Sequence, residues 1–276
     1  MGQPAAPVTA RAALDRFFDG YYRLRPVTAT FTGIHQYDDR LPDWSTEGLD
    51  RACAMMRACR DDLREAGRVD DVAVRRFPDD VDLALADGFL EIQIAEHEGT
   101  HFYSSNPALW TGEAVFSVLS LVTRDGAPLD QRVAAATARM QAIGGFFDAG
   151  RKTLTGAPAA WTAKALRECD AAAILFGSSL PAWFETCGVQ ASLAAKAVAA
   201  AESARDSFHA FAHWLSQSLP AAEHLYSLSA TTPSLELLLQ RGHWISEPID
   251  VLLAEASAAL DESSADAEIP RLEIIS

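Results

Sequence analysis

The chain has 276 residues, of which 49% are hydrophobic and 22% are charged, a balance typical of globular proteins. Its 38 acidic residues against 23 basic ones give a formal net charge of −15. This charge repels phosphate backbones and anionic membrane surfaces, so we expect neither a nucleic acid nor a membrane as partner. No apolar run approaches the roughly 20 residues that span a bilayer. The first residues show no basic stretch followed by an apolar core, so we expect a cytoplasmic protein without a signal peptide.

Four cysteines are scattered along the chain without C-x-x-C pairing, at Cys53, Cys59, Cys169 and Cys187. In a chain of this size, such cysteines are expected to be reduced thiols that pack as small hydrophobic side chains. Cys53 and Cys59 are six positions apart, so on one helix their side chains would point in different directions. We therefore expect no disulfide framework, and these two cysteines make a poor metal pair.

Apolar residues recur three and four positions apart over most of the chain, which is the spacing of amphipathic helices. In chain order, the pattern predicts helices over residues 9–24, 45–67, 78–99, 113–124, 128–147, 158–176, 192–219 and 248–260. A polar loop is expected over residues 26–45, and no run of alternating β-branched residues predicts a strand. The predicted fold class is therefore all-α, a multi-helix array.

The helical pattern extends to about residue 261, and no low-complexity linker divides it. We therefore expect residues 1–261 to form a single helical domain. From Glu262 to Ser276 the pattern dissolves into acidic and small residues, and the chain stops without a cap. Residues 262–276 are interpreted as a frayed tail or as the end of an interrupted chain.

The helix expected over residues 78–99 is apolar on two sides. Its apolar residues form two groups, Leu85, Phe89 and Ile92 on one side and Leu83, Leu90 and Ile94 on the other. Such a helix is expected to lie between two neighbours. If part of a larger fold is absent, one of these sides and the apolar face of the helix over 248–260 would remain uncovered.

The most specific local motif is the sequence from His97 to His101, which satisfies H-E-x-x-H. On a helix, His97 and His101 would share one face and could bind Zn²⁺, with Glu98 as the base that activates a metal-bound water. The sequence thus offers Glu98 as a candidate catalytic residue and the two histidines as candidate metal ligands.

Two features weigh against this zinc site. Gly99 lies inside the motif, where it costs about 1 kcal/mol relative to alanine, and the motif falls at the expected end of its helix. A third ligand is also required, and nothing in the sequence distinguishes Glu113, the nearest carboxylate on the following helix. The alternative interpretation is a helix terminus in which the histidines interact with the last carbonyl groups. We therefore assign no catalytic or metal-binding residue from the sequence.

A second histidine pair, His209 and His213, is also spaced four positions apart. These histidines flank an apolar stripe and have no carboxylate between them. We interpret them as polar residues at the edge of a long amphipathic helix.

Several short motifs resemble a known family when their order is considered. They are Tyr21-Tyr22, Pro26, Ala29-Thr30, Gly33, His35, Tyr37-Asp38, Leu41 to Ser45, Asn106-Pro107, Arg139 with Ile143, Leu154, Pro158 to Thr162, and Phe211 with Trp214-Leu215. Together they resemble the bacterial "domain of unknown function 885" family over nearly the whole chain up to about Leu260. One departure is Gly144, where the family tends to have proline.

The resemblance implies an all-helical fold similar to the N-terminal half of zinc carboxypeptidases of the gluzincin type. Family members are considerably longer, and their own H-E-x-x-H helix and third ligand lie in the C-terminal half, beyond the end of this chain. The motif at His97 falls at a different place, where the family carries no metal. The resemblance thus implies zinc for the full-length family, but no cofactor in this chain.

Three functional hypotheses remain open from the sequence. The favoured one is an N-terminal helical portion of a metallopeptidase-like protein, not catalytic alone, which acts with a separately encoded C-terminal half or self-associates. The second is a self-contained zinc hydrolase that uses His97, Glu98 and His101. The third is a non-catalytic helical interaction protein.

Overall fold

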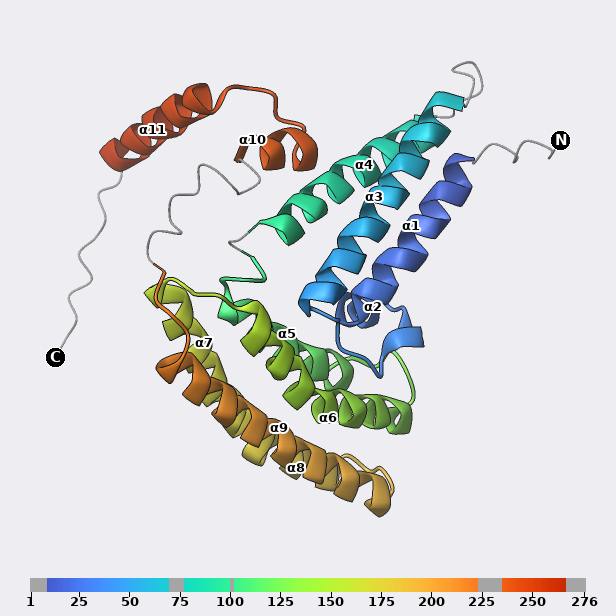
Figure 1. The fold of residues 1–276 in the computed structure, drawn as a ribbon, viewed down its shortest axis with the longest axis vertical. Helices are drawn as coiled ribbons and strands as arrows, with labels where there is room; N and C mark the ends of the chain where they lie inside the picture. The colour runs from blue at the N-terminus through green and yellow to red at the C-terminus, as the bar shows by residue number, and fades with distance from the viewer. Residues whose placement is uncertain (1–8, 70–76, 100–101, 223–234, 267–276) are drawn as a thin grey trace.

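The computed structural model describes residues 9–69, 77–99, 102–222 and 235–266. Within these ranges the regular elements are helices, and the only extended pairing is an isolated bridge between Ala157 and Ala221 (Figure 1). The all-α class predicted from the sequence is confirmed. In this part of the chain, no helix has the length and apolar character that crossing a membrane requires.

The N-terminal helices form one packed group of α1 (Ala10–Leu24), α3 (Thr46–Val69) and α4 (Phe77–Glu98). Thr9 caps the start of α1, because its hydroxyl accepts a hydrogen bond from the Ala12 amide. Apolar residues three and four positions apart on the three helices build the first core. Its buried members are Ala13, Phe17, Ala52, Cys53, Met56, Cys59, Leu63, Ala66, Leu83, Ala86, Leu90 and Ile94.

The second group contains α5 (Pro107–Val122), α6 (Leu129–Thr153), α7 (Ala159–Ile174), α8 (Leu180–Thr186) and α9 (Ala191–Gln217). Its core is larger and more aromatic. The rings of Phe147 and Phe211 stack with their centroids 4.3 Å apart, joining α6 to α9. In Figure 1, α5 and α6 lie between the N-terminal group and the long α9.

The predicted loop over residues 26–45 is wrong in its first part. Here α2 (Pro26–Phe31) and the short 3₁₀ helix η1 (His35–Tyr37) connect the two groups. Pro26 ends α1 but also occupies the first turn of α2, where its missing N–H costs nothing and its fixed φ suits a helix. The β-branched and alanine residues that follow did not give a long enough periodic pattern to reveal a helix of six residues.

Other helix boundaries also differ from the prediction. α5 begins at Pro107, earlier than expected, because the Asn106 side chain caps it by accepting a hydrogen bond from the Ala108 amide. The helix predicted over residues 158–176, with Gly177 next in the sequence, does not stop there but passes through a π-helical turn, η2 (Leu175–Ser179), into α8. A glycine signals a C-terminus only where the chain turns to positive φ, and among the described glycines that occurs at Gly33 and Gly188.

The predicted burial of the cysteines is confirmed for three of the four, and the predicted edge position of His209 and His213 is confirmed. All four cysteines are free thiols, and Cys53, Cys59 and Cys169 are buried. Burial raises the pKa of Cys169 to about 12, so this thiol stays protonated. His209 and His213 are exposed on α9 beside the buried Phe208 and Phe211, as expected for the edge of an apolar stripe.

The C-terminal described segment holds α10 (Leu235–Leu237), the π-helical turn η4 (Leu238–Gly242) and α11 (Ile249–Asp266). η4 packs on α4, whereas α11 lies apart from both helix groups (Figure 1). Leu253 and Leu260 of α11 are each about two-thirds exposed, at 65% and 66%. The helix extends five residues into the predicted tail, of which residues 267–276 lie outside the described part.

Candidate functional site

The H-E-x-x-H motif lies at the C-terminal end of α4, which stops at Glu98. The amide of Gly99 still bonds to the carbonyl oxygen of Ala95, at 2.8 Å. Thr100 and His101 lie outside the described residues, so the structure does not test whether His97 and His101 share a face. Of the three candidate residues in the motif, the structure therefore gives positions for His97 and Glu98.

His97 faces the interior. Its Nδ1 lies 2.8 Å from the carbonyl oxygen of Gln93, and its ring centroid lies 4.7 Å from that of Tyr103. Burial, helped by the positive charge of Arg25, lowers the pKa of His97 to about 4, so the ring is neutral at physiological pH. The bond to a carbonyl oxygen requires the proton on Nδ1, because a carbonyl can only accept.

Glu98 is directed differently. It forms an ion pair with Arg57 of α3, and its side chain is about half exposed. The carboxylate of Glu98 and the ring of His97 therefore have separate partners, one on the surface and one in the interior. In this structure both residues join α4 to its neighbours.

A polar cluster around Arg25 lies where α1, α4 and α5 meet. The Arg25 guanidinium donates to the side-chain oxygen of Gln93 and to the Tyr103 hydroxyl, the latter at 3.3 Å. Gln93 in turn donates to Glu96, at 2.6 Å. Burial raises the pKa of Glu96, and it raises the pKa of Tyr103 to about 12. The positive charge of Arg25 opposes both shifts. The four residues are joined in one hydrogen-bonded chain.

Glu113, the carboxylate considered as a third zinc ligand, also faces this region. Burial raises the pKa of Glu113 to about 7, and the positive charges of Arg25 and Arg139 oppose the rise. A buried carboxyl with a pKa near neutrality can exchange a proton at physiological pH, which is a property of many catalytic acids and bases. The cavity beside Arg25 and His97 has a volume of about 20 Å³, room for about one water molecule. This volume is too small for an organic substrate.

The described residues do not assemble a metal site. No group of three or more histidine, cysteine, aspartate or glutamate side chains within the described ranges is arranged to hold an ion. The interior cluster that contains His97 already holds a cation, the guanidinium of Arg25, which hydrogen-bonds to Gln93 and Tyr103. A second cation placed there would be repelled by it.

A second polar network joins the two helix groups through Arg139 of α6, which is fully buried. Its guanidinium donates to the carbonyl oxygens of Ser117 and Pro26, at 2.7 and 3.1 Å, and to the Thr30 hydroxyl at 2.6 Å. Thr30 in turn donates to Asp38, at 2.6 Å. One arginine thus connects α6 with α5, α2 and the loop that follows η1.

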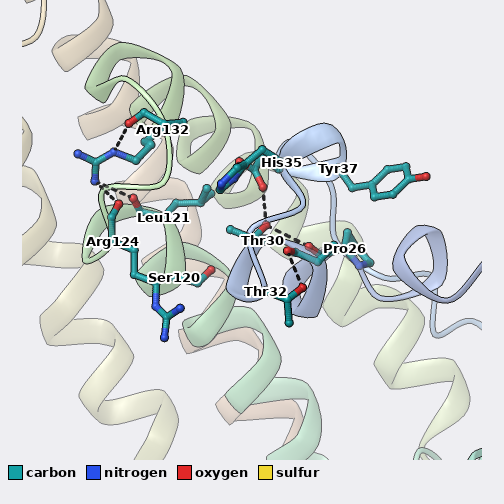
Figure 2. A network of polar contacts seen from close by, with 12 residues as sticks. Pro26, Thr30, Thr32, His35, Tyr37, Ser120, Leu121, Arg124 and Arg132 are labelled. Atoms are coloured by element: carbon teal, nitrogen blue, oxygen red, sulfur yellow. Dashed lines mark hydrogen bonds and ion pairs between the residues drawn. The ribbon is translucent and has the colours of Figure 1, made fainter. Parts of the chain in front are cut away.

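Figure 2 shows the surroundings of this network. A cavity of about 250 Å³ lies beside it, lined by Thr30, His35 and Arg132 among others. Arg132 donates to the carbonyl oxygen of Leu121, in the last turn of α5, and to that of Arg124, just after the helix. His35 and Thr30 line the same cavity (Figure 2). His35 is held by Asp38, with its Nδ1 at 2.8 Å from the carboxylate. The cationic side chains at this cavity already have protein partners, so they stabilise the junction of the helices.

The comparisons with known proteins agree with this architecture. A family model described as "Bacterial protein of unknown function (DUF885)" matches residues 26–233. The chain belongs to the DUF885 family. A solved structure described as a "putative lipoprotein of unknown function" from Shewanella oneidensis shares the fold, with a TM-score of 0.65 and 18% identity. The match covers 80% of this chain but only 38% of that protein. No curated protein sequence matches the chain.

Within this DUF885 protein, sequence reasoning did not find Arg25 or Arg139 as organising residues. A signal for Arg139 was present, because it follows Ala136 by three positions and precedes Ile143 by four, on a face that is otherwise apolar. A charged residue on a core face indicates a buried polar network. Arg25 gave no such signal, because it lies between two helices.

Proposed function

We propose that this DUF885 chain is the N-terminal helical portion of a metallopeptidase-like protein and is not catalytic alone. It acts with a C-terminal half that carries the zinc site, or it self-associates. The observation that carries this proposal is the partial match to a larger protein. Most of this chain matches little more than a third of the Shewanella oneidensis protein, so the shared helices are one part of a longer chain there.

The geometry at the motif supports the same conclusion. His97 is bonded to Gln93 and packed on Tyr103 in the interior, and Glu98 is paired with Arg57 at the surface. A hydrolytic zinc centre needs three protein ligands and a base beside the bound water. The cytoplasmic location remains part of this proposal, in agreement with four unpaired cysteines.

Protein incubated with zinc and then desalted is expected to retain much less than one equivalent of the metal. Two histidines leave tetrahedral Zn²⁺ half coordinated, and Arg25 beside His97 disfavours a second cation. Elemental analysis by mass spectrometry measures the retained zinc, and hydrolysis of blocked dipeptides tests for peptidase activity. We expect no hydrolysis by the chain alone.

His209→Ala is the matched control, because this histidine belongs to an exposed i, i+4 pair on α9. Tight stoichiometric zinc that disappears in His97→Ala but not in His209→Ala would establish the zinc-hydrolase alternative. Peptidase activity that is lost in Glu98→Gln would contradict the proposal in the same way.

The exposed apolar face of α11 is expected to cause self-association or binding of a hydrophobic dye. Leu253 and Leu260 face solvent, and an uncovered apolar surface of this kind is normally buried against a partner. Size-exclusion chromatography with light scattering measures the mass, and we expect the double change Leu253→Glu and Leu260→Glu to shift the protein to monomer. Ile174→Glu, at another exposed apolar residue on α7, is the control. A compact, dye-negative, cooperatively melting monomer would refute the idea of an incomplete fold.

A further inference from the structure

Residues 235–266 form a C-terminal arm, made of α10, η4 and α11, that has little apolar attachment to the rest of the protein. None of the residues over 235–263 is buried in the structure. Leu235 and Trp244, on either side of η4, are each 56% exposed. Burial of apolar side chains therefore contributes little to the position of the arm, and its polar contacts carry more of the attachment.

The polar contacts of the arm converge on Arg241 of η4. Its guanidinium forms ion pairs with Asp87 and Glu91, which lie one turn apart on α4. Burial by itself would raise the pKa of Asp87, but hydrogen bonds from Arg60 and Arg64 of α3 lower it, so this carboxylate stays ionised. Two carboxylates of α4 are thus shared by three guanidinium groups, two from α3 and one from the arm.

The guanidinium of the arm is the one that this network can lose at little cost. Removing one partner of a buried ion pair is expensive when the other charge is left alone. Without Arg241, however, Asp87 would keep Arg60 and Arg64, each at 2.8 Å, and Glu91 would keep Arg60. The side chain of Arg241 is already 36% exposed and would enter water. Neither carboxylate of α4 would be left without a counter-charge.

A close approach of two backbones completes the contact. A Cβ atom on Gly88 of α4 would lie 2.7 Å from the carbonyl oxygen of Arg241, which is closer than real contacts allow. A Cβ atom on Gly242 would lie 3.3 Å from the Cδ1 atom of Ile92. η4 therefore fits against α4 only because residue 88 has no side chain.

η4 lies over one of the two apolar sides of α4. This side carries Leu85, Phe89 and Ile92, which line a groove of about 530 Å³ together with Arg241 and Gly242. Leu85 is 48% exposed even with η4 in place. The opposite side of α4 is buried in the first core. The position of the arm thus determines how much of the first side meets water.

We propose that the contact between η4 and α4 is a reversible latch, which opens as ionic strength rises and uncovers this apolar side of α4. In the closed form, Arg241 shares the carboxylates of Asp87 and Glu91, and its carbonyl group lies against Gly88. In the open form the arm leaves α4, while α3 keeps both carboxylates neutralised. Salt favours the open form because the ion pairs of Arg241 are partly exposed, and ions screen such pairs. This inference does not depend on the proposed peptidase relationship.

Trypsin cleavage after Arg241 reports the state of the latch. The protease needs a free arginine side chain on an extended backbone, and in the closed form both are held against α4. No other lysine or arginine lies between Arg205 and Arg271, so mass spectrometry identifies the fragment that begins at Gly242. Raising sodium chloride from about 0.05 M to about 1 M shortens the Debye length to about 3 Å. We expect cleavage after Arg241 to become about fivefold faster, relative to a chromogenic peptide in the same buffer.

Gly88→Ala tests the backbone fit without weakening α4, since alanine is a better helix former than glycine. Its methyl group would meet the carbonyl oxygen of Arg241. We therefore expect cleavage about tenfold faster than in wild type at low salt, together with more binding of a hydrophobic dye. Gly145→Ala in α6 is the matched control, because nothing lies within 4 Å of a Cβ atom there. Circular dichroism melts verify that both variants are folded.

Glu91→Gln tests the charges separately. It removes one carboxylate from Arg241 while Arg60 keeps Asp87, so we expect cleavage about threefold faster at low salt. Glu202→Gln, at an exposed glutamate of α9, is the control and is expected to match wild type. The proposal is overturned if cleavage after Arg241 does not change with salt, or if Gly88→Ala and Gly145→Ala are cleaved equally fast. Wild-type cleavage at low salt as fast as that of a synthetic peptide of residues 235–248 would also overturn it.

Discussion

Arg139→Ala is expected to lower the free energy of unfolding by about 3–4 kcal/mol, since it removes a buried charged donor from several acceptors at once. The guanidinium joins α6 to the Ser117 carbonyl of α5 and to Pro26 and Thr30 of α2. Its removal leaves buried acceptors without a donor and a cavity between the two helix groups. Urea unfolding followed by far-UV circular dichroism measures the change.

Two further variants make this prediction specific. Arg167→Ala removes an exposed arginine of α7 and is expected to change stability by less than about 0.5 kcal/mol. Arg139→Lys keeps the charge but loses the planar, forked donor geometry, so we expect a loss nearly as large as that of Arg139→Ala. A lysine variant as stable as wild type would show that charge alone matters. An alanine variant within 1 kcal/mol of wild type would show that the network does not hold the groups together.

The helical class and most long helices could be predicted because each long helix carries its own periodic signal. On α9, Ala201, Phe208, Phe211 and Leu215 form one apolar stripe, and on α4, Leu83, Leu90 and Ile94 form another; both stripes are buried in the structure. Short elements could not be found in the same way. α2 has six residues, too few for a period of 3.6 to repeat twice. Its start is hard to recognise because a proline such as Pro26 can mark the end of one helix as well as the first turn of the next.

The candidate site was harder to predict, for a physical reason. The sequence showed His97 and Glu98 as neighbours in a motif, but partners that are distant in the sequence decide what each side chain does. Arg57 draws Glu98 to the surface, and Tyr103 packs on His97 in the interior. The same limit applies to the contact between η4 and α4, because Arg241 is remote in the sequence from its ion-pair partner Asp87.

Glu113→Gln is expected to stabilise the protein at pH 8 by about 1–3 kcal/mol and to have no effect near pH 4. Burial raises the pKa of Glu113 from 4.5 to about 7 in the folded protein, although Arg25 and Arg139 oppose the rise. Below pH 4.5 the carboxyl is protonated in both the folded and the unfolded state. Between pH 4.5 and 7 the unfolded state loses the proton first, so wild-type stability falls as the pH rises. Glutamine stays neutral and avoids this loss.

The difference in unfolding free energy between wild type and Glu113→Gln, measured by urea titration from pH 4 to 8, isolates this carboxyl from its neighbours. The neighbouring His97 acts in the opposite direction, because its pKa is lowered to about 4 and its contribution is lost as the pH falls from 6.5. That contribution is common to both proteins and cancels in the difference. Glu202→Gln, at an exposed glutamate of α9, is expected to give a flat difference over the same range. If Glu113→Gln is instead less stable than wild type at pH 8, the carboxylate is ionised in the folded protein. It would then act as the stabilising counter-charge of Arg25 and Arg139, not as a protonated group at the junction of the helices.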